Sequence, residues 1–508
     1  MSPTNNTFKP PTAGARLVQL PFENAEARCR LDRHDPSIGD AHQRVEVTVS
    51  KRIDISQNTA DAGTIEAGSS RTLLWAGIAG SVIAAGSLWF VWRHGILAAI
   101  TWPDDASRIA AVLIFVVTYV VVAIGKLPGF QIDRAGAALL GASLMVAFGV
   151  IPIEDAYRAI DFDTITLLLG MMIVVANLRL SGFFRLVNSW AVTRAHHPAV
   201  MLGAVVVVTG VLSAFLVNDA ICLVMAPIVI ELTRALKRNP VPYLIAVALA
   251  SNIGSTATIT GNPQNMIIGN LSHIPYGTFT AALAPVAGIG LVLTIVLVAL
   301  FHPREYWTRE RLPSATLASH YHGWLVAKST LVTAVMVVLF FLGQPVAKVA
   351  IVAGALLLLT RRVKAHKVYE EIDGPLLLMF AGLFVVVAGI EKSVLTPDVI
   401  ASAGRLKHFE SPAVLSSITA VLSNLVSNVP AVLVLRPFVA PLADPQRAWL
   451  VIAMASTLAG NFTLLGSVAN LIVAQRAAAD GIKIDFWSYF LVGAPLTVAT
   501  IIIGVLLL

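Results

Sequence analysis

The chain has 508 residues, of which 56% are hydrophobic and 13% are charged, and its formal net charge is +7 at pH 7. Soluble domains average about 45–50% apolar and about 25% charged residues, so this composition excludes an ordinary soluble protein and indicates an integral membrane protein. The two cysteines, Cys29 and Cys222, provide neither a disulfide framework nor a set of zinc ligands. Basic residues cluster between apolar runs, so we interpret the positive charge as topological and expect no nucleic-acid partner.

Residues 1–70 are polar and mixed in charge and contain no apolar run long enough to cross a bilayer. We therefore predict a disordered cytosolic tail there. The first apolar run begins near Thr72, which is too far from the start for a secretory leader. We expect that run to form an extra N-terminal span, within 71–104, that has no counterpart later in the chain.

Apolar runs of the length that crosses a hydrocarbon core, about 17 to 25 residues, recur along the chain. The earlier runs lie at 72–92, 106–125, 135–151, 162–180, 243–269 and 278–301. The later runs lie at 325–343, 346–360, 374–390, 447–474 and 488–508. These runs predict an all-α polytopic membrane protein.

Two further apolar segments, 198–236 and 411–443, are each interrupted by a polar residue, Asn218 in the first and Asn428 in the second. Non-helical backbone at membrane depth is tolerated only where protein or a water-filled cavity surrounds it. We therefore predict that each segment enters the membrane and returns as a re-entrant hairpin, with the asparagine at its tip.

The polar interruptions belong to an internal duplication. LSAFLVNDAICLVMAPIVIEL (212–232) aligns without a gap with LSNLVSNVPAVLVLRPFVAPL (422–442). In the same way ALASNIGSTATITGNPQNMI (248–267) aligns with AMASTLAGNFTLLGSVANLI (453–472). Polar breaks at corresponding places in two halves of a membrane protein are typical of a transporter's binding site.

The duplication extends upstream of the hairpins. Asp161, Gly170 and Ser181 match Asp373, Gly382 and Ser393 at one constant spacing. We predict two repeats, 105–301 and 325–508, joined by a cytosolic linker at 302–324. Each repeat has an odd number of spans besides its hairpin, so the second repeat is inverted, and the spans 243–269 and 447–474 are broken helices.

The positive charges provide an independent test of this topology, because Lys and Arg accumulate in cytosolic loops. The loops predicted to lie inside hold Lys126 and Arg134; Arg179, Arg185 and Arg194; Arg234, Lys237 and Arg238; Arg304, Arg309 and Arg311; Arg361, Arg362, Lys364 and Lys367. We therefore expect a multi-pass protein of the cell (inner) membrane with a cytoplasmic N-terminus.

The chemistry is expected where the apolar runs break. Broken helices offer free N–H groups to an anion, whereas freed carbonyls and Asn, Ser or Thr oxygens suit a small cation. The predicted substrate- or ion-binding residues are Asn218, Asp219, Ser251, Asn252, Thr256, Thr258, Gly261, Asn262, Ser427, Asn428, Gly460, Asn461, Thr463 and Gly466. The alternative is that these residues only cap and pack half-helices.

Asp219 is the residue with the strongest functional signal, because a carboxylate near the bilayer centre costs at least about 2.5 kcal/mol and is usually paired, protonated or functional. We interpret Asp219 as a proton-coupling or cation-coupling group. The alternative is an N-cap of the second hairpin arm. Its partner in the second repeat is Val429, so the fold itself does not require the carboxylate.

The segments 212–229 and 250–269 resemble the signature region of the arsenite permease and NhaD-type sodium/proton antiporter group. This group belongs to the ion transporter superfamily, which also includes carriers of citrate and other di- and tricarboxylates. The resemblance covers 105–508. It implies a rigid scaffold, often dimeric, so that a homodimer is expected, and a transport domain that moves against the scaffold in an elevator-like cycle.

In the carboxylate carriers of this superfamily a Ser-Asn-Thr triplet at both hairpin tips holds sodium and the substrate carboxylate. This chain has Val217-Asn218-Asp219 at one tip and Ser427-Asn428-Val429 at the other. Both tips depart from the triplet, and the acidic tip fits a proton-linked member of the superfamily better.

We therefore expect a secondary active transporter of a small anion or an arsenite-like metalloid oxyanion, coupled to a proton or sodium gradient. A sodium/proton antiporter and a di- or tricarboxylate carrier of the citrate type are the alternatives. No cofactor is expected beyond the coupling ion, for which Asn218, Asn252 and Asn428 could hold sodium. The sequence has no HExxH, GxSxG or Walker motif, so we expect no enzyme activity.

Overall fold

The computed structural model describes residues 104–125, 131–194, 197–308, 312, 321–360, 363–394 and 410–508, and every regular element in these ranges is helical. The all-α prediction is therefore confirmed for the described chain. The predicted tail at 1–70, the extra span within 71–104 and much of the linker at 302–324 lie outside the described residues. So do the predicted inside charges Lys126, Arg309, Arg311, Arg361 and Arg362.

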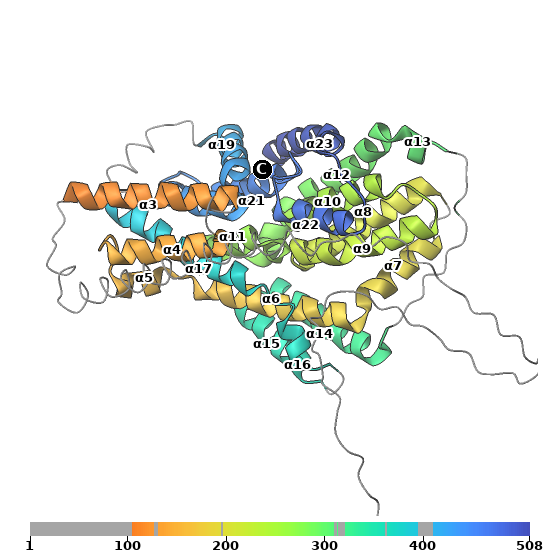
Figure 1. Cartoon of the computed structure of the whole chain (residues 1–508), viewed down its shortest axis with the longest axis horizontal. Helices are drawn as coiled ribbons and strands as arrows, with labels where there is room; N and C mark the ends of the chain where they lie inside the picture. Colours follow the sequence, from red (N-terminus) through yellow and green to blue (C-terminus); the bar gives the residue numbers. More distant parts are fainter. Residues whose placement is uncertain are drawn as a thin grey trace, which may run out of the picture. The chain divides into compact units, whose positions relative to one another are not determined.

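The helices follow one another in two similar series (Figure 1). The first series is α3 (Asp104–Ile124), α4 (Arg134–Ala147), α5 (Ile153–Ala159), α6 (Phe162–Ser181), α7 (Phe183–Arg194), α8 (Pro198–Phe215), α9 (Asn218–Ala235), α10 (Pro240–Thr256), the short 3₁₀ helix η1 (Ile259–Gly261), α11 (Pro263–Ser272), α12 (Tyr276–Phe301) and α13 (Pro303–Tyr306). The second series is α14 (Gly323–Phe341), α15 (Val346–Leu358), α16 (Ala365–Tyr369), α17 (Gly374–Ser393), α19 (Pro412–Val426), α20 (Asn428–Val439), α21 (Pro445–Ala459), α22 (Val468–Ala479) and α23 (Phe486–Leu507).

Seven of the described helices are long and apolar enough to cross a membrane, namely α3, α6, α8, α12, α14, α17 and α23. Six of them coincide with predicted spans. The predicted spans at 135–151 and 346–360 correspond to the shorter apolar helices α4 and α15. The helices α5, α7, α13 and α16 were not predicted, because short helices next to long spans carry little hydrophobic periodicity of their own.

The half-helices begin where the sequence provides a cap. The Asn239 side chain accepts a hydrogen bond from the backbone of Val241 at the start of α10, and Asn262 accepts from Asn265 at the start of α11. The carboxylate of Asp444 does the same for α21. Each of these helices has proline in its first turn, where the missing N–H costs nothing. Of these caps, that of Asn262 lies within the apolar run 243–269, where it lets the chain stop and restart a helix.

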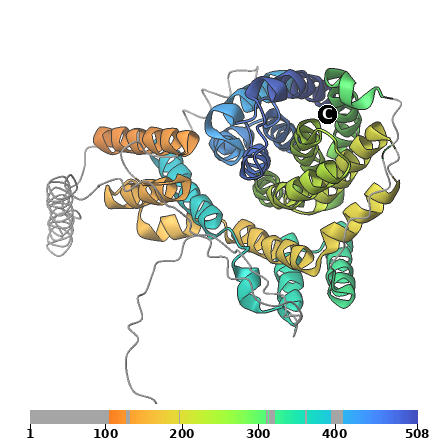
Figure 2. The ribbon, with the colours of Figure 1, turned by 45° about the vertical axis from the view of Figure 1, so that its right-hand side comes forward.

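Helices of the first series pack on helices of the second series in matching pairs. Helix α6 packs on α15, and its counterpart α17 packs on α4. Likewise α9 packs on α22 and α20 packs on α11, while α8 with α10 has its counterpart in α19 with α21. Figure 2 shows the helices of 198–301 and those of 412–507 gathered in one bundle. Each half therefore completes the packing of the other.

Two matched glycines allow the closest of these crossings. A Cβ atom on Gly170 would lie 2.5 Å from the carbonyl carbon of Ala350, and a Cβ on Gly382 would lie 2.6 Å from that of Ala138. Both distances are too short for real atoms, so these positions tolerate no side chain without moving a helix. Gly170 and Gly382, which match in the duplication, therefore make the same kind of close backbone contact.

Candidate functional site

The tips of the two helix pairs meet at one cavity. The backbone leaves the helix at Leu216 and Val217 between α8 and α9, and at Ser427 between α19 and α20. Ser427 has a φ of 77°, which residues other than glycine rarely adopt. Such strained backbone conformations are concentrated at functional sites. The cavity has a volume of about 500 Å³.

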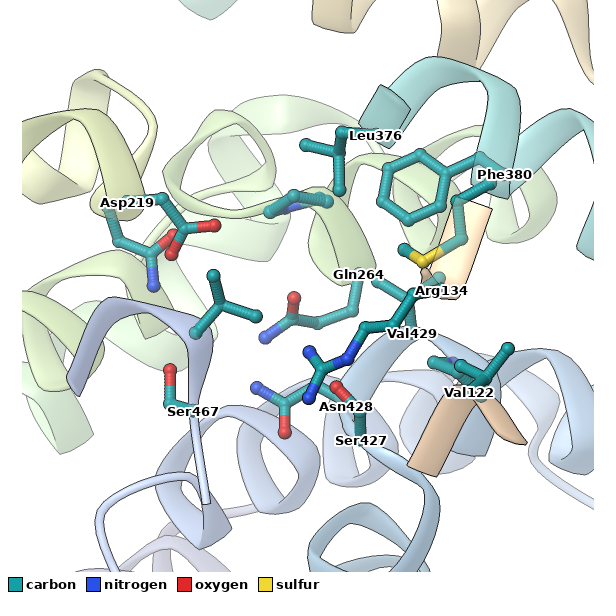
Figure 3. A pocket seen from close by; sticks show the side chains of 15 residues that line it. Val122, Arg134, Asp219, Gln264, Leu376, Phe380, Ser427, Asn428, Val429 and Ser467 are labelled. Atoms are coloured by element: carbon teal, nitrogen blue, oxygen red, sulfur yellow. The ribbon is translucent and has the colours of Figure 1, made fainter. Parts of the chain in front are cut away.

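Residues from both halves line this cavity (Figure 3). They are Val122, Arg134, Asn218, Asp219, Pro263, Gln264, Leu376, Met379, Phe380, Ser427, Asn428, Val429, Pro430, Ser467 and Val468. Of the predicted binding residues, Asn218, Asp219, Ser427 and Asn428 are therefore on the cavity wall. The other predicted residues do not line this cavity, and six of them are buried polar residues: Ser251, Asn252, Thr256, Thr258, Asn262 and Asn461.

Asn252 is the centre of a buried polar network and is completely buried. Its Nδ2 donates to Oδ1 of Asn461 at 2.9 Å and to Oδ1 of Asn470 at 3.0 Å. Its Oδ1 accepts from Nδ2 of Asn218 at 3.0 Å and from Oγ of Ser467 at 3.1 Å. One side chain therefore joins the first tip to the broken segment of the second half.

The second half has a related but different arrangement. Thr457 stands where the duplication places Asn252 in the first half, and its Oγ1 accepts from Nδ2 of Asn262 and from Nε2 of Gln264, both at 3.1 Å. At the second tip, Oγ of Ser423 donates to Oδ1 of Asn428 at 2.6 Å. The two tips are therefore anchored by the same kinds of side chain but by different bonds.

Freed carbonyls at both breaks are already occupied by protein. Nδ2 of Asn265 donates to the carbonyls of Ser255 and Thr258 at 3.1 and 3.0 Å. Nδ2 of Asn470 donates to the carbonyls of Gly460 and Thr463 at 2.7 and 3.1 Å. These two asparagines align in the duplication, and each bridges two carbonyls across its break.

Several predicted residues are explained by this scaffolding. Oγ1 of Thr256 donates to the carbonyl of Asn252 at 3.1 Å, and Ser251 Oγ donates to the carbonyl of Asn218 at 3.2 Å. The Thr258 hydroxyl donates to the carbonyl of Ala214.

Gly261 and Gly466 allow close backbone packing at the two breaks. A Cβ on Gly261 would lie 2.2 Å from the Ser255 carbonyl oxygen, and a Cβ on Gly466 would lie 2.9 Å from that of Gly460. The alternative of packing and capping therefore accounts for these two glycines, whereas the residues at the tips face the cavity.

Asp219 lies in the first turn of α9, whose N-cap is Val217, and it makes no side-chain capping bond. Within the described chain no hydrogen bond or ion pair holds its carboxylate. It lines both the tip cavity and a second cavity of about 760 Å³. The capping interpretation is therefore not what the structure has, and the carboxylate is available to a solute or an ion.

The second cavity continues toward a third one of about 1080 Å³. Both are lined by Leu223 and Val224 of α9 and by the ion pair of Arg179 with Glu371. A series of adjoining cavities thus leads from Asp219 to a part of the protein that is predicted to be cytosolic.

Arg134 and Gln264 also line the cavity, although neither is among the predicted site residues. Arg134 was counted among the inside charges, and it is the first residue of α4. One signal was present in the sequence: at the spacing that aligns Asp161 with Asp373, Arg134 aligns with Val346. A charge that only one repeat carries is not required by the shared fold.

The first tip has two buried oxygens without a partner among the described residues, Oγ of Ser213 and Oδ1 of Asn218. Their counterparts in the second half, Ser423 and Asn428, are bonded to each other. Unpartnered buried oxygens are costly, and oxygens of this type suit a small hard cation. These residues therefore fit sodium in chemistry.

Residues 111–459 match the family of proteins described as citrate transporter (CitMHS). The chain belongs to this citrate transporter family. It is 31% identical over 451 residues to the silicon efflux transporter LSI3 of Oryza sativa subsp. japonica, which covers 75% of this chain and 93% of that protein. It is 23% identical over 490 residues to the putative transporter arsB of Dictyostelium discoideum, covering 74% and 87%.

The fold also has a solved counterpart. This counterpart is the YdaH transporter of Alcanivorax borkumensis, whose crystal structure has an unusual topology. It is 14% identical in sequence, with a TM-score of 0.52, and the match covers 80% of this chain and 97% of that chain. At this identity the likeness concerns the fold alone. The family and its named relatives show that the protein is a secondary transporter rather than an enzyme, and the resemblance to the ion transporter superfamily is confirmed.

Proposed function

We propose that the transporter moves a small anion or an arsenite-like metalloid species across the cell (inner) membrane by alternating access, driven by a proton or sodium gradient. The observation that carries this proposal is the cavity at which both tips meet, with the unpaired Asp219 on its wall. Half-helix ends and polar breaks around a central site are the usual construction of secondary transporters. The relative named as a silicon efflux transporter supports a small oxygen-rich solute.

The two halves are inverted repeats in this proposal, and the N-terminus is cytoplasmic. Ion pairs between distant helices support it, because each joins ends that the predicted topology places on one side. Arg234 pairs with Asp480 on the inside at 2.8 Å, and Lys392 pairs with Asp155 on the outside at 2.6 Å. The Lys392 ammonium, by its hydrogen bond and its charge, also holds the pKa of Asp155 below its usual range.

Asp219 supplies the coupling in this proposal. A carboxylate exposed to the cavity can carry a proton in one half of the cycle and release it in the other. Sodium coupling is the second candidate, and the unpartnered oxygens of Ser213 and Asn218 favour it. With sodium as the ion and no solute moving, the protein would be a sodium/proton antiporter.

Counterflow tests the proposal. Proteoliposomes preloaded with unlabelled citrate, succinate, sulfate, phosphate, silicic acid or arsenous acid are diluted into the labelled form of the same solute. We expect transient accumulation of label for at least one of them, because a carrier exchanges solute faster than it returns empty. Absence of counterflow for all six, with sodium-driven proton movement retained, would reject the solute carrier and leave the antiporter.

A further inference from the structure

Arg134 brings a positive charge to the tip cavity. Figure 3 shows its side chain entering from α4 with the guanidinium directed toward Ser427 and Asn428. The carboxylate of its neighbour Asp133 is used to cap the backbone N–H of Gly136, at 2.8 Å. Within the described ranges no ion pair or hydrogen bond holds the Arg134 side chain, although it is half-buried.

A half-buried guanidinium without a partner is costly, because it gives up part of its contact with water. Its five N–H donors form a planar fork that matches the oxygens of a carboxylate or other oxyanion. The neighbouring cavity groups add donors of the same kind, namely the amides of Asn428 and Gln264. Asp219 is the one acidic residue on the cavity wall.

The shared fold does not explain this charge. The spacing that aligns Gly170 with Gly382 aligns Arg134 with Val346. The other ionisable residue of the cavity, Asp219, likewise has an apolar counterpart in the second repeat. The cavity therefore carries one cation and one carboxylate that were added to a symmetric framework.

We propose that Arg134 binds a negatively charged oxygen group of the transported solute, so that the site selects ionised oxyanions or carboxylates over neutral hydroxylated acids. This inference rests on the proposed transport function. Silicic and arsenous acids are largely uncharged at neutral pH, whereas citrate, succinate and sulfate are anions. A guanidinium distinguishes the two classes because its charge-assisted bonds need an ionised partner.

Ligand binding and counterflow together test the role of Arg134. We expect citrate, succinate or sulfate to raise the apparent Tm of the purified wild type, and Arg134→Gln to weaken that binding about 10- to 100-fold, the range for losing bonds to a charged group. Arg134→Lys should retain part of the affinity. Arg476→Gln, which removes an exposed arginine of α22, is the matched control and should bind normally.

Two results would separate the inference from the function on which it rests. Counterflow of silicic or arsenous acid that is unchanged in Arg134→Gln, with no anion bound, would overturn the inference and leave the carrier. Anion binding that depends on Arg134 without any counterflow would support the binding role and contradict the transport proposal.

A second inference rests on a difference between the two ends of the molecule. Both carboxylate oxygens of Asp161, at the start of α6, accept from Nδ2 of Asn270 at 2.8 Å, and α6 packs on α11. The equivalent residues are Asp373, at the start of α17, and Gln475 in α22. Both are exposed, and in the described chain no hydrogen bond joins them and α17 has no comparable packing on α22.

A cavity occupies the place of that missing contact. The cavity of about 760 Å³ is lined by Asp373, which caps α17, by Leu376 of α17, and by Val468 and Ile472 of α22. One end is therefore closed by an amide–carboxylate contact, and the other end, predicted to be cytosolic, is open.

We infer that these two contacts are alternative latches. In the opposite state Asp373 binds Gln475 and closes the cytosolic end, while Asp161 separates from Asn270 and opens the outer end. Matching pairs of helices join the two halves, so the backbone can make equivalent contacts with either latch closed. The longer side chain of glutamine keeps the same amide chemistry as Asn270.

Cysteine pairs test the latches, in a background with Cys29→Ser and Cys222→Ala. We expect oxidation of Asp161→Cys with Asn270→Cys, and of Asp373→Cys with Gln475→Cys, to block counterflow in both cases, reversibly by dithiothreitol. A reporter, Leu223→Cys on the inner cavities, should react with maleimide in the first locked form and at least about tenfold more slowly in the second.

The results also separate this inference from the transport proposal. Failure of the second pair to cross-link, or cross-linking that leaves counterflow intact, would overturn the latch exchange while transport stands. Exclusive cross-linking of the two pairs in a protein that shows no counterflow would support the two states and contradict the carrier.

Discussion

We expect Asp219→Asn to abolish ion-coupled transport, with solute-driven proton movement falling by at least about tenfold, which corresponds to about 1.4 kcal/mol or more. The substitution keeps the shape of the side chain but removes the group that can gain and lose a proton. In the described chain this carboxylate holds no other residue, so the fold should remain intact. Proton movement is measured with a pH-sensitive dye inside proteoliposomes.

Asp163→Asn is the matched control for that experiment. Asp163 is an exposed aspartate in the first turn of α6 and lies on no cavity wall that involves the tips. We expect its substitution to leave both the rate and the coupling unchanged. A similar loss in both variants would indicate a general effect of charge at the membrane and not a role of Asp219.

The second large effect is expected at Asn252. Asn252→Leu leaves Asn218, Ser467, Asn461 and Asn470 each without one hydrogen-bond partner. A buried polar group left unsatisfied costs roughly 1–3 kcal/mol, so the variant should lose several kcal/mol of stability and lower the apparent Tm by at least about 5 °C. Thermal unfolding of the purified protein in detergent measures the change.

Asn177→Leu provides the comparison, because Asn177 is also buried but donates only to the Ile173 carbonyl of its own helix, at 2.8 Å. We expect a loss of about 1 kcal/mol there. Equal losses in the two variants would contradict the central place of Asn252 in the network between the halves.

Much of the helical framework could be predicted because membrane spans are long apolar runs with few charges, which the sequence shows directly. The predicted span at 162–180 and the helix α6 differ at one end by a single residue. The helix α7 could not be predicted, because it carries polar residues and follows α6 with only Gly182 between them. Gly182 adopts φ of 86°, which ends α6 without any apolar signal.

The site was predicted as a set of residue types but not as a geometry. The duplication located Asn218 and Asn428, which the structure brings to one cavity. The same reasoning could not separate them from Thr258 and Gly261, because residues that line the cavity and residues that hold the surrounding backbone are of the same small types. Only the contacts distinguish a side chain that faces space from one that holds a carbonyl.

Charged residues were the least predictable part. Arg134 follows the same positive-inside pattern as the cations of the loops, yet it lines the cavity. Arg436 stands within the apolar segment 411–443, and in the structure its Nε lies 3.8 Å from Oε1 of Glu391. Sequence spacing within one helix cannot reveal such a pair, because Glu391 lies on another helix, α17.

In the proposed mechanism, solute and ion meet at the cavity that carries Asp219. The most direct test is proton movement in sodium-free proteoliposomes on addition of the solute that shows counterflow, for the wild type beside Asp219→Asn. We expect proton movement that requires the solute in the wild type and disappears in the variant. Proton movement of equal size in both proteins would contradict it.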